Sequence, residues 1–558
     1  MRRALLCLLP LALAAASPKP PARPKLVVVI SVDQFGEDLL ERFGAELKGG
    51  LGRLQREAQW FRQAYHDHGI TETGPGHSVL LTGRYPSGTG IVENEWIDPQ
   101  DGQLRYCTLD PQSHPLARPS APGASYANLR VTALGDWLLA QAPGSRVFAM
   151  AGKDREAIFM AGRRPTAAFW FEGSAGFSTS TYYADKLPGW LETFNAELLA
   201  RFQQAPWTWT ATGPFPANAR AGHWKLPDGF ELTTGGLPRD ILPGGAVPNG
   251  AALNRFIRSP FYDQVTLDAA LALMKGEDLG HGAGTDLLVV GLPSTDYVGH
   301  KYGPGSQEMF DNLRRLDAEL PALLDEIHAR DPKAWVILTA DHGSMDAPEV
   351  LASEGMNAVR LLPRDFQDRL NLGLAHRLGV ARNLVRLSPS GYNLTLVREA
   401  LTAVHIGVDQ ARAALLAELR SQEPGTDGKL HPAYPELEGA WTAEELAPLR
   451  RARSADPRRT PLKMRVAHSF VPGRSGDVML AFHPHVFPSM PSDDYTGGHG
   501  SFWDYDRRVP IFFWGPWKAG RRRDPVRTVD LAATLAKLLG LKPDEPLDGR
   551  PIQLAASK

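Results

Sequence analysis

The sequence is poor in cysteine. It has two cysteines in 558 residues, Cys7 and Cys107. Cys7 lies in an N-terminal apolar segment that we expect to be removed, so Cys107 has no partner for an intramolecular disulfide in the mature chain. A scaffold held together by disulfides is therefore excluded. With 43% hydrophobic residues, a chain of this length can instead bury a substantial core.

Strong net charge and long hydrophobic runs are also missing. The formal net charge is −1, and no basic tract of the kind that follows a phosphate backbone occurs, so binding of a nucleic-acid polymer is not indicated. The apolar run 4–16 has thirteen residues, too few to span a bilayer comfortably. It follows two arginines and ends in small residues, which is typical of a secretory signal. We predict a signal peptide over 1–16, a catalytic chain over 17–558 and a periplasmic or secreted location; an uncleaved anchor is the alternative.

Several common catalytic signatures are absent as well. No strand is followed by a glycine-rich loop with Lys-Ser or Lys-Thr, and the Gly-Gly-His-Gly segment 497–500 is too short for a dinucleotide loop. The Gly-x-Ser-x-Gly elbow of serine hydrolases is also missing. There is no internal repeat or low-complexity tract.

Three strongly hydrophobic segments reach an aspartate at or just beyond their ends. Segments 25–33, 286–296 and 334–341 are too continuous in apolar residues for surface strands and are typical of buried parallel strands. In an open α/β sheet, catalytic groups lie at the carboxyl ends of such strands. The pattern predicts a doubly wound, mostly parallel sheet sandwiched by helices. Taken singly, each aspartate is weak evidence for a site, because an aspartate after a strand is very often just the N-cap of the following helix.

Neighbouring histidines favour a metal site over simple caps. Asp296 and His300 have the spacing that places both on one face of a helix, and Asp341 is followed directly by His342. Carboxylate and imidazole are ligands that zinc accepts, and two clusters of three donors leave coordination positions open. Asp33 and His499, the latter in a glycine-rich loop, complete six candidate donors.

Thr73 is the candidate nucleophile. It precedes a Gly-Pro-Gly turn and an apolar stretch that can begin a helix, so its hydroxyl would lie near helix-terminal N–H groups that attract anions. A lone threonine at such a place could also be only an N-cap or turn residue.

Together, these motifs resemble those of the alkaline phosphatase superfamily. Within it, the chain is similar to the phosphate-irrepressible alkaline phosphatases that use threonine in place of serine, which are related to the nucleotide pyrophosphatase/phosphodiesterases. The motifs occur in family order over nearly the whole mature chain: the strand ending at Asp33, Thr73-Gly-Pro-Gly-His-Ser, Gly90-Ile-Val-Glu-Asn94, Gly152-Lys153-Asp-Arg155, Asp296-Tyr-Val-Gly-His300, Thr339-Ala-Asp341-His342-Gly343 and Gly498-His499-Gly500.

The resemblance implies a two-zinc phosphatase that forms a phosphothreonine at Thr73 and releases inorganic phosphate. It implies one zinc held by Asp296, His300 and His499, and a second held by Asp33, Asp341, His342 and the Thr73 oxygen. Asn94, Lys153 and Arg155 would hold the non-bridging phosphate oxygens. The expected substrates are small phosphate monoesters.

Lys153 and Arg155 decide between the branches of this superfamily. If the strand over 146–151 continues, their spacing points both side chains to the same side. Two fixed cations suit the dianion of a phosphomonoester, and the diesterase relatives lack this pair. Asp154 and Glu156 could instead neutralise both charges in a surface turn. The alternatives are a phosphodiesterase and, in another class, a catalytically silent exported binding protein.

Two other histidine motifs are assigned structural roles. His66 and His68 flank Asp67 where a strand is expected, and alternation would send the histidines to one side and the aspartate to the other. His77 lies in the first turn after Thr73 and is expected to pack there or to support a ligand.

Two long stretches contain none of these motifs. We predict insertions at about 165–284 and 349–494 that form a cap over the metals, because loops after sheet strands commonly carry selectivity. Segments 509–515 and 528–541 are expected to form a core strand and a covering helix.

Overall fold

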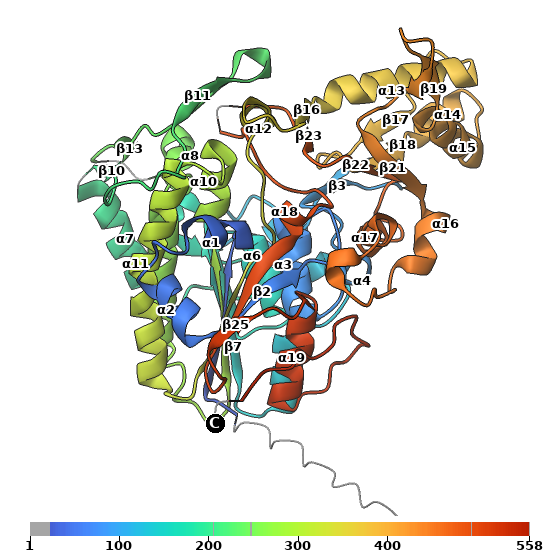
Figure 1. The fold of residues 1–558 in the computed structure, drawn as a ribbon. Helices are drawn as coiled ribbons and strands as arrows, with labels where there is room; N and C mark the ends of the chain where they lie inside the picture. The colour runs from blue at the N-terminus through green and yellow to red at the C-terminus, as the bar shows by residue number, and fades with distance from the viewer. Residues whose placement is uncertain (1–22, 205, 246–247, 493, 557–558) are drawn as a thin grey trace, which may run out of the picture.

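The computed structural model describes residues 23–204, 206–245, 248–492 and 494–556. Their centre is a ten-stranded sheet with the order β25-β2-β24-β15-β1-β14-β7-β8-β9, in which β26 also pairs with β2. Helices cover both faces of this sheet (Figure 1). The predicted signal peptide over 1–16 lies outside the described residues.

The middle of the sheet is parallel. Five neighbouring strands run in one direction: β15 (Trp335–Thr339), β1 (Leu26–Val32), β14 (Asp286–Leu292), β7 (Arg146–Ala151) and β8 (Ala167–Phe171). β24 (Arg508–Trp514) is antiparallel to both β15 and β2 (Gln59–Tyr65), so β2 again has the direction of the central strands. The edges are β25 (Gly520–Arg522), β26 (Val526–Arg527) and β9 (Phe177–Ser178). The expected doubly wound, mostly parallel sheet is confirmed.

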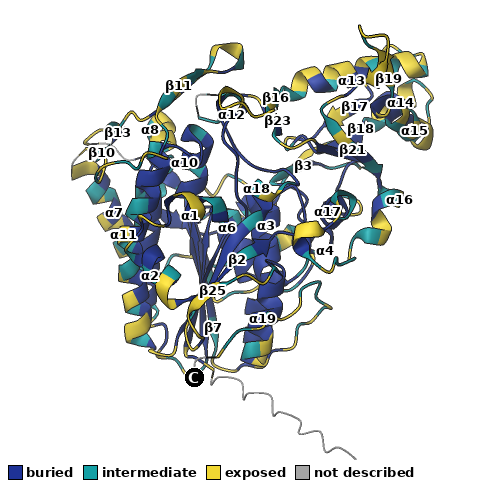
Figure 2. Cartoon of the chain, viewed as in Figure 1, coloured by how far each residue is buried: buried dark blue, intermediate teal, exposed yellow. Residues whose placement is uncertain are grey.

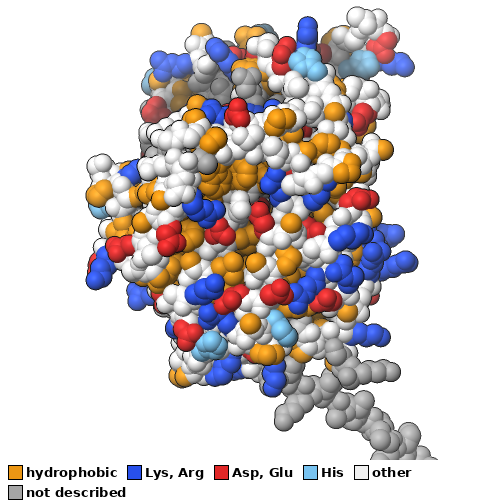
Figure 3. Space-filling view, turned by 90° about the vertical axis from the view of Figure 1, so that its left-hand side faces the viewer, with side chains coloured by type: hydrophobic (Ala, Val, Ile, Leu, Met, Phe, Trp, Pro, Cys, Tyr) orange, Lys and Arg blue, Asp and Glu red, His pale blue; other side chains and the backbone are white. Residues whose placement is uncertain are grey.

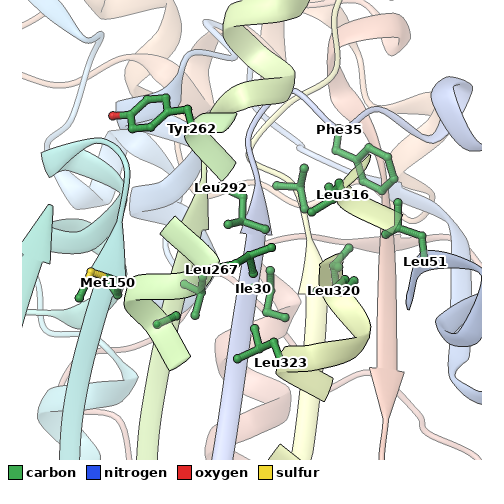
Figure 4. Close-up of a cluster of buried hydrophobic side chains, with 14 of the residues drawn as sticks. Ile30, Phe35, Leu51, Met150, Tyr262, Leu267, Leu292, Leu316, Leu320 and Leu323 are labelled. Carbon is green, nitrogen blue, oxygen red and sulfur yellow. The ribbon is translucent and has the colours of Figure 1, made fainter. Parts of the chain in front are cut away.

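The strand β1 shows why the sheet is buried on both sides. Its successive side chains point to opposite faces, so Val28 and Ile30 enter one hydrophobic core while Val27 and Val29 enter another. All seven residues of the strand are buried. The sheet therefore forms the dark interior layer in Figure 2, and Figure 4 shows Ile30 among leucines of the covering helices.

Two sets of helices form these cores. One face is covered by α1 (Glu37–Phe43), α2 (Gly50–Glu57), α7 (Gly189–Gln204), α9 (Phe261–Gly276), α10 (Ser294–Tyr302) and α11 (Gln307–Arg330). The other face is covered by α3 (Thr73–Thr82), α5 (Leu134–Gln141), α6 (Asp154–Ala161) and α19 (Asp530–Leu539). The segments expected as a C-terminal core strand and covering helix are thus β24 and α19.

Most of the second predicted insertion folds around a sheet of its own. Its four strands have the order β17-β18-β22-β21, and they share a separate hydrophobic core with the helices of this segment. This unit stands at the upper right of Figure 1. The helices and strands of the whole insertion are α12 (Pro348–Ser353), β16 (Val359–Leu361), α13 (Pro363–Leu378), β17 (Val385–Leu387), β18 (Asn393–Leu396), α14 (Arg398–Ala403), α15 (Val408–Leu419), β19 (Gln422–Pro424), β20 (Leu430–Pro432), β21 (Leu437–Thr442), α16 (Ala443–Leu446), α17 (Leu462–Ser469), β22 (Val478–Phe482) and β23 (Val486–Pro488).

The boundaries of the first predicted insertion, at about 165–284, need correction. β8 and β9 extend the main sheet, and α9 contributes Val265, Leu267 and Leu273 to the main core. The tryptophan- and proline-rich composition concealed these core elements. Only the central part forms small separate sheets, β10 (Trp207–Trp209) with β13 (Arg239–Leu242) and β11 (Gly222–Lys225) with β12 (Glu231–Thr234), next to α8 (Gly250–Ile257).

The outer surface carries charges of both signs. On the face shown in Figure 3, basic and acidic side chains are interspersed with apolar ones. In the part of the chain that the structure describes, no helix is long and apolar enough to cross a membrane.

Candidate active site

The predicted site residues come from neighbouring strands of the parallel sheet. Asp33 follows β1, Asp341 follows β15, Asp296 lies in α10 after β14, and Lys153 follows β7. These four strands are adjacent in the order β15-β1-β14-β7. Because they are parallel, their carboxyl ends meet at one edge, which brings together residues far apart in the sequence.

Two compact groups of possible metal ligands lie at this edge. One contains Asp296, His342 and His499, and the other contains Asp33, Asp341 and His342; within each group the ligand atoms lie within 4.8 Å of one another. His300 is close to the first group, with its Nε2 3.1 Å from Asp296 Oδ1. His342 is within reach of both groups, so these distances do not divide the ligands between two ions, and that division still rests on the family resemblance.

The histidines are oriented by backbone carbonyls. Nδ1 of His300 lies 2.9 Å from Gly497 O, Nδ1 of His342 lies 3.0 Å from Gly343 O, and Nδ1 of His499 lies 2.7 Å from Thr71 O. Because a carbonyl can only accept a hydrogen bond, each Nδ1 carries a proton. In the neutral ring this leaves the lone pair on Nε2, which faces the carboxylates. Metal-binding histidines are typically held in this way.

The carboxylate groups suit a bound cation. Asp33 Oδ1, Asp341 Oδ2 and His342 Nε2 are buried, and among the described residues none of these atoms has a hydrogen-bond partner. They nevertheless converge, since His342 Nε2 is 3.4 Å from Asp33 Oδ1 and 3.2 Å from Asp341 Oδ2. Burial, with repulsion from Asp296 and Asp341, raises the pKa of Asp33 to about 6. Oxygen and nitrogen donors arranged around unsatisfied negative charge fit divalent metal ions such as zinc.

Lys153 lies between the two carboxylate groups. Its Nζ forms an ion pair with Asp33 and lies 2.6 Å from Asp296 Oδ2. Burial acts to lower the pKa of Lys153, but attraction to Asp296 and Asp33 outweighs it and raises the pKa. The ammonium therefore contacts two predicted metal ligands as well as facing the site.

The strand before Lys153 and Arg155 does not continue through them, so the condition for placing both side chains on one side of a strand is not met. β7 ends at Ala151 and α6 begins at Asp154, with Lys153 as its N-cap. The carboxylate of Glu156 accepts a hydrogen bond from the Lys153 amide, which stabilises this helix start. The two cations thus reach the site from a helix N-terminus and not from one side of a strand.

Thr73 is the first residue of α3, and two predicted substrate-binding side chains lie beside it. Arg155 Nη2 is 3.4 Å from Thr73 Oγ1. The Asn94 side-chain oxygen accepts a hydrogen bond of 2.7 Å from the backbone amide of Gly74, and the backbone amide of Asn94 donates to the Glu72 carboxylate over 2.6 Å. A side chain at Gly76 would approach the Asp341 carbonyl oxygen to 2.4 Å, so glycine permits α3 to pass directly over this ligand.

Some residues at the site were not singled out from the sequence. Gln34 donates from Nε2 to Asp296 over 3.0 Å and from its backbone to Asp341 over 3.1 Å. Tyr106 contacts Arg155, and Glu72 contacts Asn94. In the sequence, Gln34 directly follows Asp33 and Glu72 directly precedes Thr73, so these motif residues could have pointed to them. Tyr106 belongs to no motif. Nδ1 of His77 lies 3.2 Å from Asp341 Oδ2, in keeping with its expected supporting role.

The His66-Asp67-His68 motif lies outside both ligand groups. Asp67 forms ion pairs with Arg527 and Arg507, at 2.7 Å and 3.5 Å. Burial lowers the pKa of His66 to about 3, so its ring is neutral, and the rings of His66 and His68 pack edge to face. These contacts tie the end of β2 to the C-terminal segment.

With this geometry established, comparison with known proteins defines the family. Residues 27–502 match the family described as type I phosphodiesterase / nucleotide pyrophosphatase. The chain belongs to this family. The relation expected from the sequence motifs is thereby confirmed.

Similar proteins within this group are named alkaline phosphatases. Alkaline phosphatase PhoD of Zymomonas mobilis is 34% identical over 545 residues, which cover 95% of this chain and 88% of that protein. Alkaline phosphatase PafA of Elizabethkingia meningoseptica is 30% identical over 549 residues, covering 95% and 94%. A crystal structure of PafA matches with a TM-score of 0.79 at 29% identity, covering 96% of this chain and 99% of that one.

A more distant solved structure shares the fold alone. Murine ectonucleotide pyrophosphatase / phosphodiesterase 5 matches with a TM-score of 0.51 at 15% identity, covering 94% of this chain and 97% of that one. The relatives named alkaline phosphatases support a phosphoric ester hydrolase with alkaline phosphatase activity, and the ligand groups at the sheet edge can hold metal ions.

Proposed function

We propose that this protein is an exported, zinc-dependent alkaline phosphatase that hydrolyses small phosphate monoesters through a phosphothreonine intermediate at Thr73. The observation that supports this most strongly is the position of Thr73. It lies at a helix N-terminus, within 3.4 Å of the Arg155 guanidinium and close to Asn94, at the edge where the carboxylates and histidines converge.

Two zinc ions per chain are part of this proposal. Asp296, His300 and His499 would hold one ion, and Asp33, Asp341, His342 and the Thr73 hydroxyl would hold the other. Zinc supplies Lewis-acid chemistry there, lowering the pKa of a bound hydroxyl and neutralising charge on a departing oxygen. This ligand set is supported by the oriented imidazoles and by the buried Asp33 Oδ1 and Asp341 Oδ2, which have no hydrogen-bond partner among the described residues.

The chemistry at the protein's own residues has two displacements. The Thr73 hydroxyl gives up its proton and its oxygen attacks phosphorus, the ester bond breaks, and the departing oxygen takes up a proton and leaves as the alcohol, which produces a phosphothreonine. Water then attacks phosphorus from the face that the alcohol left, the Thr73 oxygen departs and regains a proton, and inorganic phosphate is released. Two inversions give overall retention at phosphorus.

The proposal of a phosphomonoester as substrate rests on three side chains, those of Arg155, Asn94 and Lys153. A phosphomonoester dianion has three non-bridging oxygens with more charge than those of a diester, and a guanidinium can donate to two of them. Arg155 has a buried Nε without a hydrogen-bond partner in the described part of the chain, so it keeps donor capacity beyond its contacts with Thr73 and Tyr106. These donors face the phosphoryl group before and during its transfer, so they contribute to binding and to stabilisation of the transition state.

A phosphodiesterase is the second candidate. It is favoured by the description of the matched family, which names phosphodiesterases and nucleotide pyrophosphatases. The two activities differ in the substituent on phosphorus, because a diester replaces one charged oxygen with an alkoxy group where Arg155 would bind.

Kinetics on a matched pair of substrates separates these candidates. We expect purified protein to hydrolyse p-nitrophenyl phosphate with a kcat/KM at least a hundred times that for bis-p-nitrophenyl phosphate, because charged hydrogen bonds to the additional anionic oxygen are lost in the diester. Direct metal analysis of the same sample should find about two zinc ions per chain. Preference for the diester would refute the monoesterase assignment, and full activity in protein without zinc would refute the metal assignment.

A further inference from the structure

Tyr106, at the end of β4 (Leu104–Tyr106), lies between the two charged side chains at the start of α6. Its hydroxyl donates to Asp154 Oδ1 over 2.6 Å and accepts from Arg155 Nη1 over 3.0 Å. Both directions follow from the partners, because a carboxylate only accepts and a guanidinium only donates. The phenol hydroxyl thus lies between the Asp154 carboxylate and the guanidinium of Arg155, the next residue in the sequence.

The segment that begins at Tyr106 also binds the other oxygen of Asp154. Thr108 Oγ1 donates to Asp154 Oδ2 over 2.6 Å, so both carboxylate oxygens have partners from this segment. An unoccupied Asp154 would be an obvious ion-pair partner for the adjacent Arg155, and such a pair would reduce the charge available to a ligand. The observed contacts leave Arg155 directed at Thr73 instead.

The hairpin that carries Tyr106 also follows Asn94. β3 (Glu95–Ile97) pairs with β4, with Glu95 opposite Tyr106, and the amide of Cys107 donates to the Asn94 carbonyl over 2.9 Å. Two of the predicted phosphate-binding groups, Asn94 and Arg155, are therefore tied to one short piece of backbone. Their separation depends on the contact between this hairpin and α6.

The Tyr106 hydroxyl keeps its proton in alkaline solution. Burial and the neighbouring Asp154 carboxylate raise the pKa of Tyr106 well above its usual range. The phenol therefore continues to donate to Asp154 and to accept from Arg155 under alkaline conditions.

We propose that Tyr106 is a positioning residue for monoester specificity, which holds the Arg155 guanidinium beside Thr73 and away from Asp154. This inference rests on the proposed function, because it takes Arg155 as the group that binds a phosphoryl oxygen absent from diesters. Tyr106 acts through Arg155 and has no contact of its own with the reacting atoms in this assignment.

The variant Tyr106→Phe removes only the hydroxyl. We expect kcat/KM for p-nitrophenyl phosphate to fall about ten-fold, and the inhibition constant for inorganic phosphate to rise by a similar factor, as for loss of one hydrogen bond to a charged group. The value for bis-p-nitrophenyl phosphate should change by less than about two-fold. Thermal midpoint and zinc content should match those of the wild type.

Tyr182→Phe is the matched control. Its hydroxyl donates a hydrogen bond to the Arg163 carbonyl over 3.0 Å, whereas the Tyr106 hydroxyl bonds to Asp154 and Arg155. The ratio of monoester to diester kcat/KM should be unchanged in this variant. A similar fall in the ratio would show that loss of any nearby phenol has this effect and would overturn the proposal.

Combining Tyr106→Phe with Arg155→Ala tests whether Tyr106 acts through Arg155. If Tyr106 acts through Arg155, adding Tyr106→Phe to Arg155→Ala should cause no further loss on the monoester. The same ten-fold loss in that background, or equal losses on both substrates in the Tyr106→Phe single variant, would overturn the proposal. Failure of the proposed function gives a different result, in which the wild type prefers the diester or Arg155→Ala lowers both activities equally.

Thr108→Val provides a second variant if Tyr106→Phe alters folding. It removes the other hydrogen bond to Asp154 and leaves the phenol in place. A smaller fall in the same ratio, with unchanged activity on the diester, would support the proposal. An unchanged ratio would contradict the proposal that hydrogen bonds to the Asp154 carboxylate keep Arg155 from forming an ion pair with it.

Discussion

The guanidinium of Arg155 lies 3.4 Å from the hydroxyl of Thr73, although the two residues are 82 positions apart in the sequence. Thr73 begins α3 and Arg155 belongs to the first turn of α6, and these two helices pack against each other on one face of the sheet. A cation from one helix start is thus held next to a hydroxyl from another. An anion placed at this point would meet both the charge and the free N–H groups of helix termini.

Removing the Thr73 hydroxyl should abolish most of the turnover. We expect Thr73→Ala to lower kcat by roughly a thousand-fold or more, whereas Thr73→Ser keeps a hydroxyl and should retain part of the activity. Mass spectrometry of peptides after rapid acid quenching should place phosphate on the peptide that contains Thr73. Phosphate trapped on a different residue would move the nucleophile there.

Replacing Lys153 and Arg155 together should change specificity. The double alanine variant should lose roughly a hundred-fold or more in the ratio of monoester to diester kcat/KM, since each charged hydrogen bond contributes about 1.5–3 kcal/mol and the losses are partly additive. Arg118→Ala, which removes an exposed guanidinium paired with Glu172, is the control and should leave the ratio unchanged. Equal loss on both substrates would show that the pair supports the fold or the metals instead.

The single variants at these positions should differ in one respect. Lys153 contacts Asp33 and Asp296, whereas Arg155 contacts Thr73 and Tyr106. Removing the Lys153 ammonium leaves the carboxylates of two predicted ligands without this neighbouring cation, so Lys153→Ala should alter the affinity for zinc. Arg155→Ala should leave that affinity unchanged. Zinc affinities measured by competition with a chelating dye check this difference.

Loss of a predicted ligand should remove both metal and activity. His300→Ala and Asp341→Ala should each lower the zinc content and reduce activity by more than the ten- to hundred-fold typical of residues that merely support a ligand. Exhaustive chelation of the wild type should abolish hydrolysis, and zinc should restore it better than magnesium. His281→Ala, at an exposed histidine, is the control. Wild-type zinc content and rate in either ligand variant would contradict that residue's assignment.

The buried acid Glu93 should make the stability of the fold depend on pH. Its Oε1 accepts hydrogen bonds from Ser388 over 3.0 Å and from Asn393, which joins the segment before Asn94 to the second insertion. Burial, with repulsion from Glu72, raises the pKa of Glu93 to about 8, above its ordinary value of 4.5. The folded state therefore holds the proton more tightly than the unfolded state does. The contribution of protonated Glu93 to the free energy of unfolding is fully present below about pH 4.5 and is lost as the pH rises through about 8.

Glu93→Gln removes this dependence, because the amide stays uncharged. Relative to the wild type, the variant should become more stable by roughly 1–3 kcal/mol between pH 5 and pH 9. Thermal midpoints of chelated protein at pH 5, 7 and 9 check the trend without changes in metal binding. Glu399→Gln, at an exposed position of the same insertion, should show no such trend. A constant difference between Glu93→Gln and the wild type would contradict the assignment.

Local patterns in the sequence are enough to predict the class of fold and the chemistry of the candidate ligands. Continuous β-branched runs that end near Asp33, Asp296 and Asp341 predict buried parallel strands, because a strand covered on both faces needs apolar residues at every position. Strand direction then places these acids at one edge. The types of donor, carboxylate and imidazole, indicate a metal without knowledge of the tertiary structure.

The way in which these groups meet depends on the three-dimensional packing of the chain. The position of Lys153 between Asp33 and Asp296 and the placement of Tyr106 against Arg155 depend on strand order and on helix packing. The same is true of β8 and α9, which belong to the main core despite a composition typical of an insertion. Hydrophobic periodicity is a local property of a few residues, whereas these contacts join segments tens to hundreds of positions apart. Their geometry follows from how whole elements pack, which no local pattern encodes.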